Sequence, residues 1–129
     1  PVDMVLTFRN VHNWAKAGSA EGMFTGFAKA LKPGGILGLV EHRAKAGTPL
    51  EKQIKSGYMT EDYVVQMAKD AGFRLDAKSE INANPKDTAD HPKGVWNLLP
   101  SLRGVEDDDK ANIISIGESD RMTLRFIKE

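Results

Sequence analysis

The chain has 129 residues, of which 40% are hydrophobic and 28% are charged, as is typical of a folded globular domain. Its 18 basic and 18 acidic residues balance, so the formal net charge is zero. Without a basic excess, a protein has no general attraction for nucleic acid or for an acidic membrane surface. The absence of cysteine excludes disulfides, thiolate catalysis and cysteine-based zinc sites. We therefore expect a single domain over residues 1–129, with no nucleic-acid or membrane partner.

The chain begins with PVDM, without an initiator methionine, and enters an apolar segment at once. We expect that upstream sequence precedes it, together with any targeting signal. The compartment is therefore left open by these residues, with a cytoplasmic location favoured.

The first half of the chain predicts a strand, a helix and a second strand. Residues 2–8, VDMVLTF, form a short apolar run typical of a strand buried on both faces. Residues 20–31 repeat apolar side chains at helical spacing, with Ser19 as the expected N-cap. KPGG at 32–35 is expected to end this helix, and GILGLVEH at 35–42 is a second apolar strand. This order predicts a βαβ unit with parallel strands.

The second half continues the alternation after a polar loop at 43–57. A helix begins at TEDY, where Thr60 is the expected N-cap. FRLDAKSEI at 73–81 alternates apolar and polar residues, which indicates a strand near the edge of the sheet. An irregular segment at 82–106 leads to a short helix in EDDDKANIISIG and to a final strand at 121–129. The whole pattern predicts half of a doubly wound α/β sheet.

Polar side chains gather at the carboxyl ends of the three predicted parallel strands. They are Arg9, Asn10, His12 and Asn13 after the first strand, Glu41, His42 and Arg43 at the second, and Glu80, Asn82 and Asn84 at the third. Ligands of open α/β sheets bind outside the carboxyl ends of the strands. We therefore expect a binding cleft at this end of the sheet.

Several alternatives for these residues stay open. A metal-dependent hydrolase would use His12, His42 and His91 with Asp120 or Glu80 around zinc or iron, but no histidine pair has a compact spacing, and we predict no metal site. A serine hydrolase would need a G-x-S-x-G turn, which is absent.

Two further pairs of residues have a structural and a functional interpretation. Asp120 and Arg121 either clamp a loop to the sheet or contact a substrate. Trp14 and Trp96 either cover the core or form an apolar wall for a substrate.

Several stretches of this sequence resemble a known family. VDMVLTFRNVHNW, FAKALKPGGILGLVEHR and GYMTEDYVVQMAKDAGFRL resemble the later half of class I S-adenosylmethionine-dependent methyltransferases. TFRNVHNW, SEINANPKDTADHPKGVW and IGESDRMTLRF resemble, more narrowly, a bacterial family of predicted methyltransferases. The resemblance covers nearly the whole chain. It implies strands four to seven of a partial, doubly wound Rossmann-like sheet, with the last strand, RMTLRFIKE, inserted antiparallel.

The resemblance also implies S-adenosylmethionine as the cofactor, although its main binding elements are missing from this chain. In that family the donor rests on a glycine-rich loop after the first strand, and its ribose on an acidic residue after the second. Neither element is present here. The resemblance therefore implies that the N-terminal, cofactor-binding half is lacking and that the fragment alone is inactive.

The resemblance assigns roles by position at the strand ends. The residues implied to line the methionine portion of the donor are Phe8, Arg9 and Asn10. Those implied to contact a small-molecule acceptor are Asn13, Arg43, Asn82 and Trp96. His12 or His42 is the implied base, since imidazole titrates near neutral pH.

Two functions follow from these expectations. The first is methyl transfer to a small-molecule acceptor. The alternative is a non-catalytic α/β module that binds a ligand or a partner, because a fold does not determine a function. In the first case a half-domain would leave the edge of its first strand, residues 2–8, bare toward a second copy of the chain, so we expect a homodimer through this strand.

Overall fold

The computed structural model describes residues 1–129, which form a mixed four-stranded sheet in the order β1-β2-β4-β3. The strands are β1 (Val2–Phe8), β2 (Leu31–His42), β3 (Phe73–Ser79) and β4 (Arg121–Lys128). β1 and β2 pair in parallel, whereas β4 is antiparallel to both β2 and β3. The predicted α/β fold and the antiparallel insertion of the last strand are therefore confirmed.

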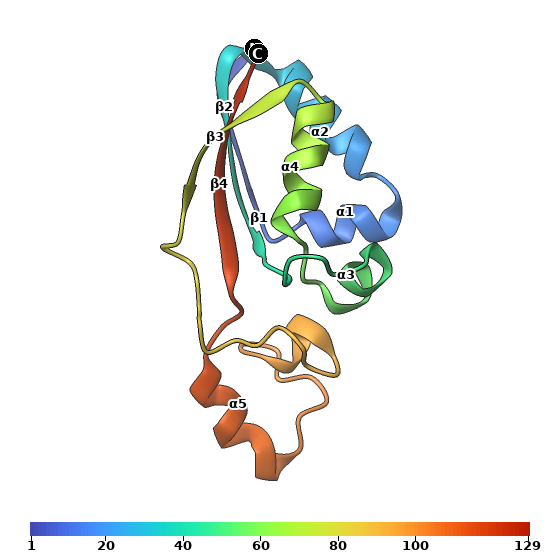
Figure 1. Ribbon diagram of the computed structural model, residues 1–129, viewed down its shortest axis with the longest axis vertical. Coiled ribbons are helices and arrows are strands. Elements are labelled where there is room, and N and C mark those ends of the chain that lie inside the picture. Colours follow the sequence, from blue (N-terminus) through green and yellow to red (C-terminus); the bar gives the residue numbers. More distant parts are fainter.

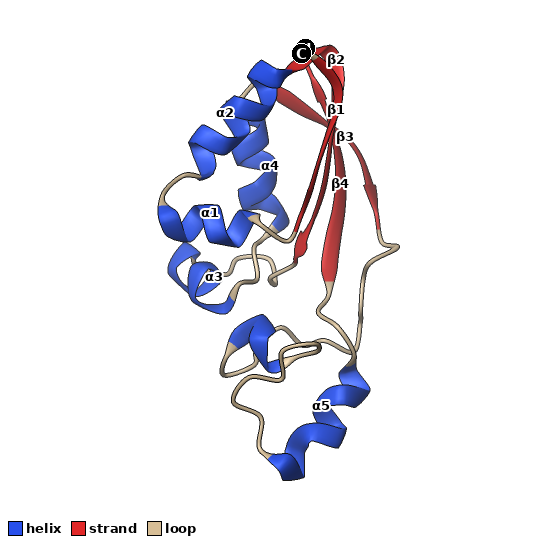
Figure 2. Cartoon of the chain, turned by 180° about the vertical axis from the view of Figure 1, so that it is seen from behind, coloured by secondary structure: helices blue, strands red, loops and turns tan.

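Four helices cover one side of the sheet, and the other side carries none (Figures 1 and 2). They are α1 (Val11–Ala17), α2 (Ala20–Ala30), α3 (Leu50–Ser56) and α4 (Glu61–Asp70). The main core lies between this layer and the sheet, where side chains such as Leu39 and Phe126 pack with Phe24 and Val64. By itself the chain is thus wound on one face of the sheet only. None of its helices has the length and apolar character needed to cross a membrane.

The apolar sequence of β1 predicted a strand buried on both faces, and this prediction is wrong. β1 is an edge strand that is buried on one face only. Thr7 faces the helices and is buried, but Val2, Met4, Leu6 and Phe8 are exposed by 45%, 52%, 57% and 54%. Successive side chains of a strand point to opposite faces of the sheet. No helix covers the second face, so the side chains of β1 that point to this face are exposed to solvent.

Short helices and turns are where the prediction fails. The segments predicted as links contain α1 and α3, and KPGG lies inside β2 because α2 already ends at Ala30. The extra residues of KPGG are accommodated by a shift in the β1–β2 register between Val2 and Met4. A Cβ atom on Gly35 would lie 2.8 Å from the Lys32 carbonyl oxygen, so this bend requires glycine.

The remaining elements follow the predicted pattern, with one exception at a helix cap. The Thr60 hydroxyl accepts a hydrogen bond from the Tyr63 N–H at 3.1 Å, as expected of an N-cap. Ser19 precedes α2 but makes no such bond, and its hydroxyl donates to the Trp14 carbonyl at 3.5 Å instead. The predicted short helix is present as a 3₁₀ turn, η2 (Asp107–Asp109), followed by α5 (Lys110–Ile116).

Candidate functional site

A cavity of about 360 Å³ lies at the end of the sheet where β1 and β2 finish and β4 begins. Its walls come from the β1–α1 link, the end of β2, the 3₁₀ turn η1 (Gly94–Asn97) with residues 99–101, and the start of β4. This volume lies in the range of small-molecule sites, and the carboxyl ends of parallel strands are where such sites form.

The structure brings most of the predicted site residues into this cavity. Its lining includes Phe8, Arg9, Asn10, His12, His42 and Trp96. Three predicted residues, Asn13, Arg43 and Asn82, are not part of the lining. Asn13 is exposed on α1, and the Asn82 amide donates to the Thr123 hydroxyl at 2.8 Å.

Arg43 is the centre of an ion-pair network beside a second, larger hollow of about 560 Å³. Its guanidinium pairs with Asp120 at 2.9 Å, with Glu61 at 3.0 Å and with Glu80 at 2.8 Å. The hydrogen bond with Asp120 is the main reason why the pKa of Arg43 is raised. The Asp120 carboxylate also accepts from the Asn84 backbone N–H at 2.8 Å. Asp120 is thus the clamp between loop and sheet.

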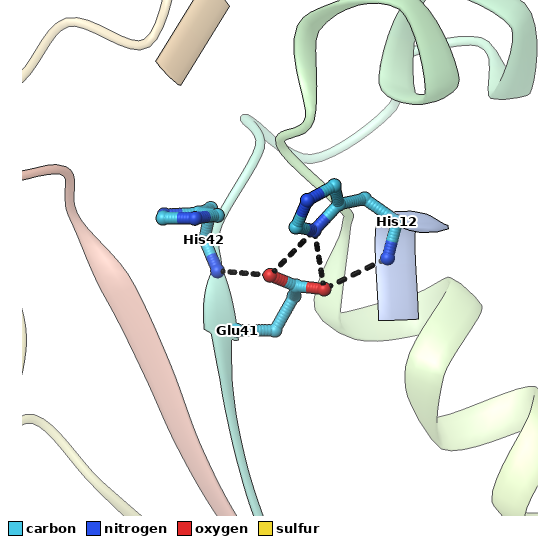
Figure 3. A group of neighbouring side chains, drawn as sticks. All are labelled: His12, Glu41 and His42. Carbon is cyan, nitrogen blue, oxygen red and sulfur yellow. Dashed lines mark hydrogen bonds and ion pairs between the residues drawn. The ribbon is translucent and has the colours of Figure 1, made fainter. Parts of the chain in front are cut away.

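His12, which lines the 360 Å³ cavity, forms a buried pair with Glu41, which lies behind the cavity wall (Figure 3). Glu41 is fully buried, and its Oε2 lies 3.0 Å from His12 Nδ1. The carboxylate also accepts from the backbone N–H groups of His12, at 2.8 Å, and His42, at 2.9 Å. A carboxylate can only accept, so Nδ1 of His12 carries the proton of this bond. In the neutral ring, Nε2 is left with a free lone pair.

The local sequence explains how this pair forms. Leu37, Leu39 and Glu41 alternate along β2 and all face the helical layer, where each is buried. His12 lies in the first turn of α1, whose backbone N–H groups have no partner inside the helix. One of them is therefore free to bond Glu41. The sequence analysis placed Glu41 among the polar residues at the strand ends but assigned it no role, although an acidic residue at an inward position of an apolar strand was a usable signal.

A second chain of contacts fixes the other histidine. Arg121 Nε donates to the Ser119 hydroxyl at 3.2 Å, and this hydroxyl contacts His42 Nδ1. Arginine only donates, so the Ser119 oxygen accepts from Arg121, and the Ser119 hydroxyl is then free to donate a hydrogen bond to His42 Nδ1. In this arrangement neutral His42 carries its ring proton on Nε2.

The charge state of His42 agrees with this arrangement. Burial lowers the pKa of His42 to about 3, and His12, Arg121 and Arg9 act in the same direction, whereas Asp87 opposes them. At neutral pH His42 is thus an uncharged hydrogen-bond donor and a weak base.

The two tryptophans have different surroundings. Trp14 packs edge-on against Phe24 and Phe27, with ring centroids 6.3 and 5.6 Å apart, and so covers the core. Trp96 lines the cavity and lies edge-on to His12 at 6.0 Å.

The three histidines do not meet around one point. His91 bonds Asp87 at 2.8 Å, away from the other two. One ligand atom each from His12, Glu41 and His42 does lie within 4.8 Å of the others, close enough to surround a metal ion. However, both Glu41 oxygens already accept hydrogen bonds from backbone N–H groups and from His12, and a metal would have to displace them.

No protein-family model and no curated protein matches this chain. Among solved structures, an S-adenosylmethionine-dependent methyltransferase from Methanosarcina mazei matches with a TM-score of 0.59 and 12% identity, over 98% of this chain and 58% of that protein. A putative sarcosine dimethylglycine methyltransferase from Galdieria sulphuraria matches with a TM-score of 0.58 and 13% identity, over 98% and 53%. The [4+2]-cyclase SpnF matches with a TM-score of 0.61 and 16% identity, over 98% and 50%.

The chain spans no more than 58% of these three structures, and 30% and 31% of two further similar structures, PhzM and TnmH. At such low identities the likeness concerns the fold alone. The chain has the mixed α/β fold seen in S-adenosylmethionine-dependent methyltransferases.

Proposed function

We propose that this chain is part of an S-adenosylmethionine-dependent methyltransferase that acts on a small-molecule acceptor. Since a cyclase also has this fold, the fold cannot carry the proposal. The observation that carries it is the Glu41–His12 pair. The Glu41 carboxylate fixes the orientation of the His12 imidazole, which lines a cavity at the carboxyl ends of the strands.

In this proposal His12 is the general base. Its Nε2 would accept the proton of an acceptor hydroxyl as that oxygen took up the methyl group that the bound donor would supply, and Glu41 would pair with the resulting imidazolium through Nδ1–H. Because two backbone N–H groups hold Glu41, the ring is oriented before the acceptor binds, which lowers the cost of reaching the reactive geometry. His42 was the alternative base, but its free ring nitrogen carries a proton and its pKa is low. His42 therefore serves as a donor.

The residues present fit only one end of S-adenosylmethionine, which would supply a methyl group on a sulfonium sulfur. Phe8 offers an exposed ring, Asn10 an amide, and Arg9 a guanidinium with no ion-pair partner in the structure, and these suit the methionine portion. The cavity lining contains no acidic residue for the ribose hydroxyls. We therefore propose that residues 1–129 are the C-terminal half of such a domain and are inactive alone.

Trp96 is the proposed wall for the acceptor. Asn13, Arg43 and Asn82 lie outside the cavity and have no part in this scheme.

Calorimetric titration with S-adenosylhomocysteine tests the proposal. We expect weak or no binding to residues 1–129 and micromolar binding to a protein that adds a preceding glycine-rich strand–loop–helix.

In that longer protein, His12→Gln should lower methyl transfer to a phenolic acceptor by about 10²- to 10⁴-fold while leaving the affinity for S-adenosylhomocysteine unchanged. His91→Gln, outside the cavity, is the matched control and should retain full activity. Failure of the longer protein to bind would leave the non-catalytic module as the better reading.

A further inference from the structure

We propose that the cavity binds an aromatic carboxylate, with Arg121 and His42 holding its carboxylate group and Trp96 lying against its ring. This inference deepens the proposed function, on which it rests for the role of the bound molecule as methyl acceptor. The binding site itself is argued from the cavity alone.

The charges around the cavity favour an anion. Its twelve lining residues include Arg9 and Arg121 but no aspartate or glutamate. Two carboxylates lie nearby. Glu41 is already bonded to His12. Glu118 is exposed and pairs with Arg121 through Nη2 alone, at 3.4 Å. The larger hollow has the opposite balance of charge, since two basic residues, Arg43 and Lys45, line it beside five acidic ones: Glu61, Asp62, Glu80, Asp87 and Asp120. The linings of the two hollows therefore differ in the sign of their net charge.

Arg121 and His42 are placed to bind the two oxygens of one carboxylate. They are directly paired across the antiparallel strands β2 and β4, so their side chains are neighbours on one face of the sheet. Ser119 links them, because it accepts from Arg121 Nε and contacts His42 Nδ1. This link leaves the Nη1 group of Arg121 and the Nε2–H of His42 without a protein acceptor. Hydrogen bonds from a guanidinium to a carboxylate are among the strongest in proteins.

The opposite wall of the cavity is apolar and suits a flat ring. It is made by Val95, Trp96, Leu99 and Pro100. Trp96 lies 6.0 Å from the His12 ring, and His12 lies 5.4 Å from the His42 ring. A ring that lies against Trp96 with its carboxylate at Arg121 therefore extends past His12. A hydroxyl group on this ring would meet Nε2 of His12, the proposed base.

Calorimetric titration of residues 1–129 with 4-hydroxybenzoate tests the inference, and 4-hydroxybenzamide, which has the same shape and no charge, is the matched ligand. We expect the anion to bind at least roughly tenfold more tightly than the amide, as a charge-assisted hydrogen bond provides. Arg121→Gln should abolish this preference, and Arg121→Lys should restore part of it. Arg125→Gln is the control, because Arg125 lies on the same strand but pairs with Asp76 and does not line the cavity. Circular dichroism would confirm that each variant is folded.

Equal affinities for the two ligands, no binding of either, or a preference that survives Arg121→Gln would each overturn the inference. The outcome is independent of the S-adenosylhomocysteine titration, since neither ligand requires the methyl donor. Anion binding without cofactor binding in the longer protein would therefore retain this site and reject the methyltransferase proposal. Cofactor binding without a preference for the anion would retain the methyltransferase proposal and reject the carboxylate site.

Discussion

Glu41 and His42 are consecutive residues of β2, and they face two different environments. Glu41 points into the helical layer, where two backbone N–H groups and His12 satisfy its oxygens. The His42 side chain contacts Ser119, and burial keeps it uncharged. Burial of an ionisable group without hydrogen-bond partners is costly. The two residues therefore show two solutions to this cost: Glu41 is surrounded by donors, and His42 gives up its charge.

The low pKa of His42 predicts a loss of stability in acid. The pKa is lowered from 6.5 to about 3 in the folded protein, so between these values the unfolded chain binds a proton that the folded chain does not. The stabilisation from neutral His42 is thus complete above pH 6.5 and is lost as the pH falls toward 3. We expect the free energy of unfolding to fall by about 1 kcal/mol between pH 7 and pH 5.5 from this residue, as measured by urea denaturation.

The matched comparison for this prediction is a His42→Asn variant, which cannot take up the proton. Its free energy of unfolding should fall less over the same range of pH than that of the unaltered chain. Parallel curves for the two proteins would contradict the assignment of the acid sensitivity to His42.

Among the secondary-structure elements, α2 and α4 differ in how they begin. The Thr60 hydroxyl caps α4 by accepting from the Tyr63 N–H at 3.1 Å, whereas the Ser19 hydroxyl makes no cap bond. We expect Thr60→Ala to destabilise the protein by about 1 kcal/mol, the usual cost of a lost cap. Ser19→Ala is the control and should change the free energy of unfolding by less than about 0.5 kcal/mol. Equal effects in urea denaturation would show that the caps do not differ in solution.

The elements that sequence analysis predicted are those with a repeated apolar pattern. The four strands, α2 and α4 each keep an apolar pattern over seven or more residues. The short helix α5 has only seven residues and was predicted from the acidic run that precedes it. In contrast, α1 and α3 have seven residues each and no side-chain cap bond. Such short helices are not stable by themselves, and their sequences contain too few turns to reveal a periodicity. Contacts with other elements must determine them, and these contacts cannot be read locally.

The same distinction explains which site residues were predicted. Arg9, His12 and His42 follow strands, so the rule for strand ends found them. The partners of these residues are distant in sequence: Glu41 is 29 positions from His12, and Ser119 is 77 positions from His42. Their contact depends on the β2–β4 register, which pairs His42 with Arg121. A single sequence does not specify such a register without the structure.

At the scale of the whole molecule, the main feature is a sheet with helices on one face only (Figure 2). β1 lies at one edge of this sheet and pairs only with β2. Its other side therefore has free backbone N–H and C=O groups. The exposed side chains of β1, including Leu6 at 57% and Phe8 at 54%, add an apolar surface beside this edge. A free edge with apolar side chains favours pairing with another strand. Because the net charge is zero, no overall repulsion separates two copies.

We therefore predict that residues 1–129 self-associate through β1 at micromolar concentration, as sedimentation velocity would show. Leu6→Lys should convert the protein to a monomer, since a charged lysine on an edge strand opposes pairing. Ile81→Lys is the matched control, because Ile81 is also apolar and is 81% exposed but lies outside the strands. This variant should associate as the unaltered chain does. A monomeric unaltered chain would contradict the prediction, and an equal effect of both lysines would place the contact elsewhere on the surface.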